Sequence, residues 1–231
     1  MIEKASDFAE KNGIDNSGKI FYPRNKEDAS KLVVFCAKNS ISVLSCVPAD
    51  PDSSKIQEES LIISTDRFTK VEQARPLDSA LAFESGATMH SIIKIIPEGF
   101  STLPFCEYPE KMTAAVLFGY SGLLKTSDAF FVEILKSDGK IFRTGTNVFS
   151  SVSRYNFLEF FSGTGSLLGI PLYYGWKLQP DEIFFTYMKK RYSINDISFE
   201  VNLSSEEKNI LTEIKKITDP AGIFRSYGNQ F

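Results

Sequence analysis

Three glycines, at positions 163, 165 and 169, constrain the fold of this chain more than any other feature. They follow an aromatic run at 155–161 and precede an apolar run at 170–176. Glycine has no Cβ, so it adopts positive φ readily and lets main-chain amides approach a ligand or another strand closely. The spacing therefore predicts a tight turn, which serves either as a simple connection or as a ligand-binding loop.

A Rossmann dinucleotide-binding motif has similar glycine spacing, but it needs a strand before its first glycine and a helix after its last. Here residues 155–161 favour a short aromatic helix, and Pro171 with the run 172–176 favours extended chain. Asp181 lies near the position of a ribose-binding acid, yet Pro180 interrupts the β-rich segment before it. We therefore reject a Rossmann site.

Hydrophobic periodicity and capping residues predict a mixture of helices and strands, which is an α+β fold. Helices are expected over 2–11, from an Asn25 cap to about 39, over 89–96 after a Thr88 cap, and to 217 after a Ser204/Glu207 capping box. Strands are expected over 19–22, 41–47, 61–64, 80–84, 129–135, 140–143, 173–178, 183–187 and 196–203. The run Ser137-Asp138-Gly139 predicts a hairpin turn, and the first strands and helix predict a β-α-β unit with a parallel pair.

Composition argues against several classes of function. With 231 residues, 42% hydrophobic and 24% charged, the chain can bury a substantial core. A net charge of −3 without a long basic run argues against nucleic-acid binding, and no apolar stretch reaches the roughly 20 residues that span a bilayer. Three widely spaced cysteines, Cys36, Cys46 and Cys106, and a polar N-terminus predict a reducing, cytoplasmic location.

The titratable side chains form no recognisable catalytic set. His90 is the only histidine, so a catalytic triad or a multi-histidine metal site is not expected. The cysteines include no CxxC pair, which argues against zinc and iron–sulfur ligation. Asp50, Asp52, Glu58 and Glu59 are expected to be solvated loop acids rather than catalytic groups or magnesium ligands. The sequence therefore indicates no catalytic base and no metal ligand.

Six short segments occur in an order that is typical of one enzyme family. They are FYPRNKEDA (21–29), LIISTDRFTKV (61–71), AFESGATMHSII (82–93), FVEILKSDGK (131–140), GTGSLLGI (163–170) and KITDPAGIF (216–224). Together they resemble the FAD-binding domain of FAD-linked oxidases of the p-cresol methylhydroxylase and vanillyl-alcohol oxidase type. The resemblance implies a two-lobed α+β domain, with a small β-α-β lobe at 1–65, a larger mixed lobe at 66–180, and a reduced cap remnant with a C-terminal helix and tail at 181–231.

The resemblance also implies FAD as the cofactor, bound largely by main-chain donors of a second loop and of the glycine segment. By this resemblance the binding residues are Thr113, Ala114, Ala115, Gly119, Gly122, Gly163, Thr164, Gly165, Gly169 and Ile170. The run 45–54, where the family has a glycine-rich pyrophosphate loop, contains no glycine. Ser53 and Ser54 are expected to replace those glycines as hydroxyl donors to the pyrophosphate.

The function implied by the resemblance is that of an FAD-binding oxidoreductase subunit similar to those of glycolate or lactate oxidases. Its flavin would accept a hydride from a 2-hydroxy acid or alcohol such as glycolate or lactate. Because only about 180–215 remain for a cap, a dehydrogenase partner subunit or a second copy is expected to complete the substrate pocket.

Two departures from the family favour another function. Alanines stand at 114–115, where the family has glycines, and Asp50 and Asp52 would repel a diphosphate. They favour a flavin-free structural or regulatory subunit of an oxidoreductase complex. A third alternative is a module that binds other phosphate ligands through the glycine segment.

Overall fold

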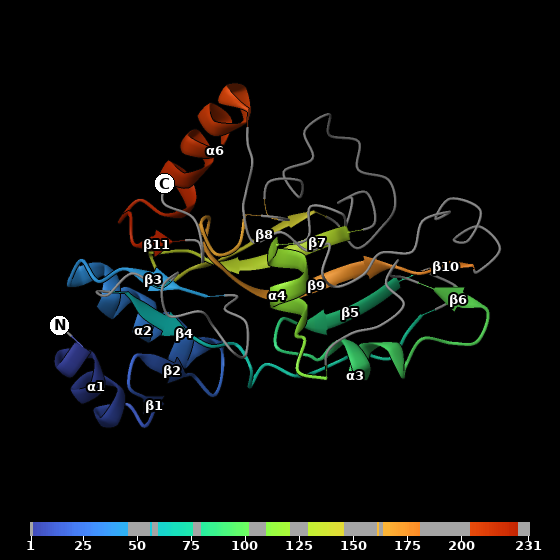
Figure 1. The fold of residues 1–231 in the computed structure, drawn as a ribbon, viewed down its shortest axis with the longest axis horizontal. Helices are drawn as coiled ribbons and strands as arrows, with labels where there is room; N and C mark the ends of the chain where they lie inside the picture. The colour runs from blue at the N-terminus through green and yellow to red at the C-terminus, as the bar shows by residue number, and fades with distance from the viewer. Residues whose placement is uncertain are drawn as a thin grey trace.

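Figure 1 shows the computed structural model of the chain, which describes residues 2–45, 56, 60–75, 80–101, 110–120, 129–145, 161, 164–180 and 204–225. Within these residues the chain forms two main sheets with helices packed against them. The predicted mixture of helices and strands is confirmed. The division into two lobes and a cap remnant stays a prediction, and the expected elements at 155–160, 183–187 and 196–203 lie outside the described residues.

The first sheet has five short strands in the order β1-β2-β4-β3-β11. They are β1 (Asp15–Ser17), β2 (Ile20–Tyr22), β3 (Val43–Leu44), β4 (Leu61–Ile63) and β11 (Phe224–Arg225). β1 and β2 form an antiparallel hairpin, whereas β2, β4, β3 and β11 run parallel to one another. β4 therefore lies between β2 and β3, which the sequence had predicted to pair directly, and the C-terminal strand β11 completes the sheet.

Helices α1 (Ile2–Lys11) and α2 (Lys26–Lys38) pack with the first sheet. The predicted cap of α2 is confirmed, because Asn25 Oδ1 accepts a hydrogen bond from the Asp28 amide at 2.9 Å. The rings of Phe8 and Phe35 stack with centroids 4.4 Å apart and so join the two helices. Cys36 lies in the core beneath them, and burial raises the pKa of its thiol to about 12.

The second sheet is antiparallel, in the order β5-β9-β7-β8. Its strands are β5 (Ala80–Glu84), β7 (Ala129–Leu135), β8 (Ile141–Gly145) and β9 (Ile170–Lys177). The predicted β7–β8 hairpin is confirmed, and Gly139 in its turn has a φ of +80°. A small pair, β6 (Phe100–Ser101) with β10 (Gln179–Pro180), lies at the end of the molecule opposite α1 and α2 (Figure 1).

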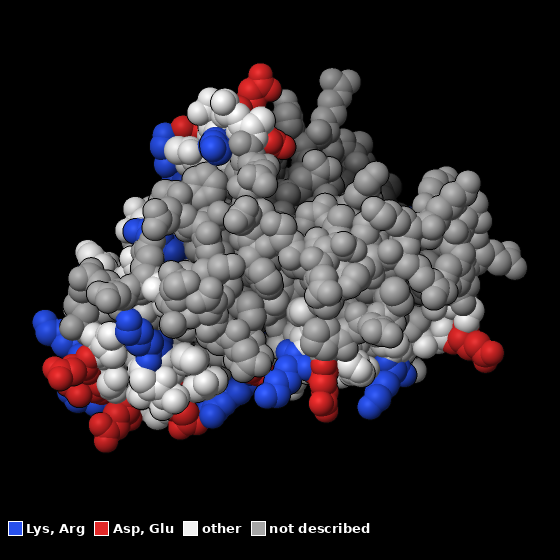
Figure 2. All heavy atoms as spheres, viewed as in Figure 1, with Lys and Arg blue, Asp and Glu red and all other residues white. Residues whose placement is uncertain are grey.

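Three more helices complete the described chain: α3 (Met89–Ile93), α4 (Ala114–Tyr120) and α6 (Ser205–Thr218). As predicted, Thr88 caps α3, and Ser204 and Glu207 form the capping box of α6. Helix α3 ends at Ile93, three residues earlier than expected. None of the described helices is both long and apolar enough to cross a bilayer. Figure 2 shows acidic and basic side chains intermingled over the α1–α2 end and on α6, so neither sign dominates the described part of this face.

Each sheet contributes residues to both of the two largest core clusters. Leu44 and Ile62 of the first sheet are buried in one cluster with α4 and the inner face of the second sheet. Leu135 and Leu172 of the second sheet are buried in the other cluster with α1, α2 and the first sheet. Each such side chain contributes roughly 1.5 to 3 kcal/mol by leaving water, so the shared core holds the sheets in a fixed relation.

Candidate functional site

The parallel strands of the first sheet end together along one edge. Leu44 pairs with Ile62 and with Arg225, so Ser45 after β3, Thr65 after β4 and Arg225 in β11 lie at the same end of the sheet. Ligands of open α/β sheets bind just outside the carboxyl ends of parallel strands. This end of the sheet, with the residues that contact it, is the candidate site, and we call it the carboxyl edge.

The glycine segment is fastened to the carboxyl edge by the fully buried Ser166. The Ser166 hydroxyl accepts a hydrogen bond from the Ser45 amide at 2.9 Å. Its oxygen lies 2.6 Å from the Arg225 carbonyl and 3.2 Å from the Ser45 carbonyl, and its single proton is donated to one carbonyl at a time. Ser166 thereby joins the segment to both β3 and β11.

The turn predicted from the glycines is confirmed in its described part, 164–169. Gly165 and Gly169 have φ values of +58° and +142°. A Cβ on Gly169 would lie 2.8 Å from the Leu135 carbonyl oxygen, so this position requires glycine for space as well as for conformation. The Gly165 amide donates to the Gly119 carbonyl at 2.7 Å, which joins the segment to α4.

The second sheet reaches the carboxyl edge through Ser85 and Gly86, which follow β5. A Cβ on Gly86 would lie 2.0 Å from the Thr65 carbonyl oxygen, so the two backbones are in direct contact. The Gly86 amide also donates to the Phe68 carbonyl at 2.9 Å, and the Ser85 carbonyl accepts from the Ala115 amide at 2.7 Å. The edge is therefore assembled from both sheets, the glycine segment and the start of α4.

Two hydroxyls at this edge are buried without a hydrogen-bond partner in the described part of the chain. The side chains of Ser45 and Ser85 are fully buried, and their oxygens have no hydrogen-bond partner among the described residues. Ser60 shares this property, but it precedes β4 and so lies at the opposite end of that strand. A buried hydroxyl without a partner costs about 1 to 3 kcal/mol, so Ser45 and Ser85 are donors suited to an acceptor that the described residues do not supply.

The run 113–122 was predicted to be a loop, but the structure shows α4 starting at Ala114. The alanines that replace the family's glycines favour helix, and the Leu117 amide donates to the Thr113 carbonyl at 3.1 Å in the first helical turn. Gly119 therefore lies within a helix, and Ile170 lies in β9 opposite Leu135. Ser53, Ser54, Gly122 and Gly163 are outside the described residues.

Most of the predicted amide donors at this site are already used within the protein. The Ala114 amide donates to the Ala87 carbonyl at 2.9 Å, and the Ala115 and Gly165 amides donate to Ser85 and Gly119 as described above. The Gly169 amide donates to the Ser166 carbonyl at 3.1 Å. Cofactor binding by these residues stays a prediction. The hydroxyls of Ser45 and Ser85 are buried and have no hydrogen-bond partner among the described residues, so they can still donate to a ligand.

Sequence reasoning missed an ion pair that supports the edge. Lys215 Nζ donates to the carbonyls of Leu167 at 2.8 Å and Phe224 at 2.9 Å, and to Asp219 Oδ2 at 2.7 Å. The Asp219 carboxylate also accepts from the amides of Ile223 and Phe224, at 3.0 and 2.9 Å. Burial lowers the pKa of Lys215, while the Asp219 carboxylate acts in the opposite direction. The i,i+4 spacing at the end of α6 was the available signal.

The candidate site contains no recognisable metal centre. No group of three His, Cys, Asp or Glu side chains in the described ranges could hold a metal ion. His90 lies exposed on α3. What the described edge provides is therefore hydrogen-bond donors in a rigid frame.

Comparison with known proteins identifies the fold. No protein-family model matches the sequence, and no curated protein sequence matches it. A variant of Phl p 4, described as a glucose oxidase, has a TM-score of 0.54 at 14% identity, over 70% of this chain and 34% of its own. Alkyldihydroxyacetonephosphate synthase has a TM-score of 0.56 at 15% identity, over 70% of this chain and 31% of its own. The chain spans about a third of the length of these proteins and shares the mixed α/β fold of FAD-binding oxidases.

Proposed function

We propose that the chain is the FAD-binding module of an oxidoreductase. The observation that carries this proposal is the carboxyl edge, where the buried hydroxyls of Ser45 and Ser85 have no hydrogen-bond partner among the described residues. The fold around this edge is similar to that of FAD-binding oxidases. The structural neighbours belong to FAD-dependent enzymes, which supports the same class for this chain. Their low identity leaves the activity itself to experiment.

The residues of the edge fit a ligand that carries many acceptor oxygens, as FAD does. Ser45 and Ser85 would donate hydrogen bonds to it, and Ser166 would keep the glycine segment in place beside them. FAD, when bound, supplies an acceptor for a hydride. The proposed substrate is a 2-hydroxy acid or alcohol such as glycolate or lactate. A dehydrogenase partner subunit or a second copy of the chain would complete its pocket.

FAD is expected to stabilise the protein, and the two edge serines are expected to contribute to this effect. At 100 times the Kd, a ligand raises the unfolding free energy by about 2.7 kcal/mol, which a thermal-shift measurement detects. Ser45→Ala and Ser85→Ala are each expected to lower this stabilisation by about 1 kcal/mol, because each removes a donor to the ligand. Without FAD, both variants should be as stable as the wild type or slightly more so, since a partnerless buried hydroxyl is removed.

Ser60→Ala is the matched control, because Ser60 is equally buried and equally without a described partner but lies away from the edge. It should leave the FAD effect unchanged. If Ser60→Ala lowers the effect as much as the edge variants do, the serines are not FAD donors. If FAD does not stabilise the wild type at all, the flavin proposal is wrong.

The alternative function is a flavin-free structural or regulatory subunit of an oxidoreductase complex. The hydrogen bonds that the amides of Ala114, Ala115, Gly165 and Gly169 already make within the protein favour it. This alternative would be supported by a colourless protein that neither binds FAD nor is stabilised by it, but that is retained on an immobilised dehydrogenase partner. A protein purified with the yellow absorbance of a flavin would exclude it.

A further inference from the structure

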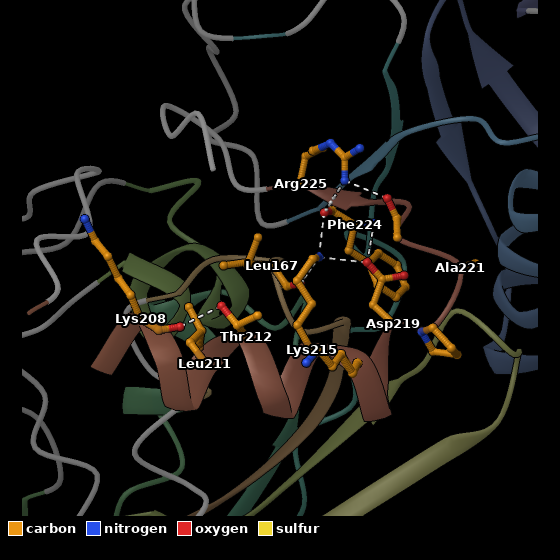
Figure 3. Close-up of a pocket in the computed structure, with 12 residues that line it drawn as sticks. Leu167, Lys208, Leu211, Thr212, Lys215, Asp219, Ala221, Phe224 and Arg225 are labelled. Atoms are coloured by element: carbon orange, nitrogen blue, oxygen red, sulfur yellow. Dashed lines mark hydrogen bonds and ion pairs between the residues drawn. The ribbon is translucent and has the colours of Figure 1, made fainter. Parts of the chain in front are cut away.

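A groove of about 810 Å³ lies between α6, the turn at 219–222 and β11 (Figure 3). Leu167, Leu211, Ala221 and Phe224 give it an apolar lining. Small-molecule sites typically enclose about 300 to 1,000 Å³ and combine an apolar lining with a few polar groups. The groove therefore has the size and lining of a site for an organic molecule. Its lining contains neither Ser45 nor Ser85, the donors proposed for FAD, although Leu167 and Arg225 connect it to the carboxyl edge.

Among the described residues that line the groove, the charges are predominantly positive, although the whole chain has a net charge of −3. The one acid of this described lining, Asp219, has a fully buried side chain, which is paired with Lys215 and accepts hydrogen bonds from two main-chain amides. Lys216 is paired with Glu213, which is not part of the lining. Lys208 and Arg225 have no ion-pair partner among the described residues, so their positive charges are available to attract an anion.

Lys208 and Arg225 lie at different positions along the groove. Figure 3 shows Lys208 toward the start of α6, whereas Arg225 lies beside Lys215, and both of these donate to the Phe224 carbonyl. Lys208 and Lys215 are separated by two helical turns, which is about 10 Å along the axis of α6. An extended anion therefore suits the groove better than a compact ion does. Arg225 Nη1 donates to the Gly222 carbonyl at 2.7 Å and to its neighbour Phe224 at 3.0 Å, which holds the guanidinium beside the groove.

We propose that this groove binds an organic phosphate of nucleotide size, with an aromatic or apolar body. The body would contact Leu211 and Phe224, and the phosphate would bind Arg225 or Lys208. A guanidinium presents a planar fork of donors that matches phosphate oxygens, and lysine adds a mobile positive charge. Such a ligand would use both the apolar and the cationic side chains of the described lining.

The test is a calorimetric titration of the full chain with 1-naphthyl phosphate, which combines an aromatic body with one phosphate. Saturable binding is expected. 1-Naphthol lacks the phosphate and inorganic phosphate lacks the aromatic body, so each should bind at least about tenfold more weakly.

Lys208→Gln is expected to weaken binding of 1-naphthyl phosphate about five-fold. Lys208→Gln combined with Arg225→Gln should weaken it more than about tenfold. Thr212→Trp, at an exposed lining position, should abolish binding by filling the groove.

Lys38→Gln is the matched control, because it removes an exposed helical lysine that is not among the described residues lining the groove. It should bind the probe as the wild type does. The proposal is overturned if the wild type shows no saturable binding, or if Thr212→Trp and Lys38→Gln bind equally well. The Ser45→Ala and Ser85→Ala variants should retain probe binding. A failure of the groove proposal is therefore separable from a failure of FAD binding.

Discussion

Asp219→Ala is expected to lower the unfolding free energy by about 3 to 5 kcal/mol, which is a large part of the stability of a typical domain. The substitution removes a fully buried carboxylate and leaves Lys215 and two main-chain amides without their acceptor. Because Lys215 also contacts the Leu167 carbonyl, the glycine segment should loosen as well. Urea unfolding followed by the fluorescence of Trp176, the single and buried tryptophan, measures the effect.

Two controls identify the cause of this loss. Asp15→Ala breaks an exposed ion pair with Arg67 and should cost less than about 1 kcal/mol. Combining Lys215→Met with Asp219→Leu should recover part of the loss, since replacing both partners leaves no buried charge without a counter-ion, while the two main-chain amides still lack their acceptor. A stability of Asp219→Ala within about 1 kcal/mol of the wild type would show that the pair does not hold α6, the glycine segment and β11 together.

Gly86→Ala is expected to cost about 3 kcal/mol, because the added methyl group would lie 2.0 Å from the Thr65 carbonyl oxygen. Neither partner is the flexible end of a side chain, so the backbones of the two sheets must move apart. The same displacement should weaken FAD stabilisation, since Ser85 is the adjacent residue. Urea unfolding and thermal shift with FAD measure the two consequences.

Gly18→Ala separates steric clash from backbone strain. Gly18 has a φ of +60° but nothing within 4 Å of the position of an added Cβ, so only the conformational penalty of roughly 1 kcal/mol applies. An equal loss of stability in the two variants would mean that the contact between Gly86 and Thr65 is not tight.

The local features of this fold were predictable from the sequence, because each depends on residues a few positions apart. The caps provided by Asn25, Thr88 and Ser204 are of this kind, and so is the hairpin turn at Gly139. The strand order was not predictable in this way. β4 inserts between β2 and β3, and β11 joins β3 from the far end of the chain, through pairings between residues distant in sequence.

The candidate site was predictable only in part, for the same physical reason. Glycine spacing predicted the turn at 164–169, because positive φ is a local property. It did not reveal that Ser166 contacts Ser45, 121 residues away. Whether an amide is free to bind a ligand depends on which carbonyl the fold places opposite it. That is why the Ala114 and Ala115 amides could not be assessed from sequence.

The most direct test of the proposed function is a titration of the purified, flavin-free chain with FAD, followed by flavin fluorescence. We expect saturable binding of one FAD per chain. Binding should be clearly weaker when Ser45→Ala and Ser85→Ala are combined, and unchanged for Ser60→Ala. A flavin signal that stays the same as in buffer throughout the titration would contradict the assignment of the carboxyl edge as a flavin site.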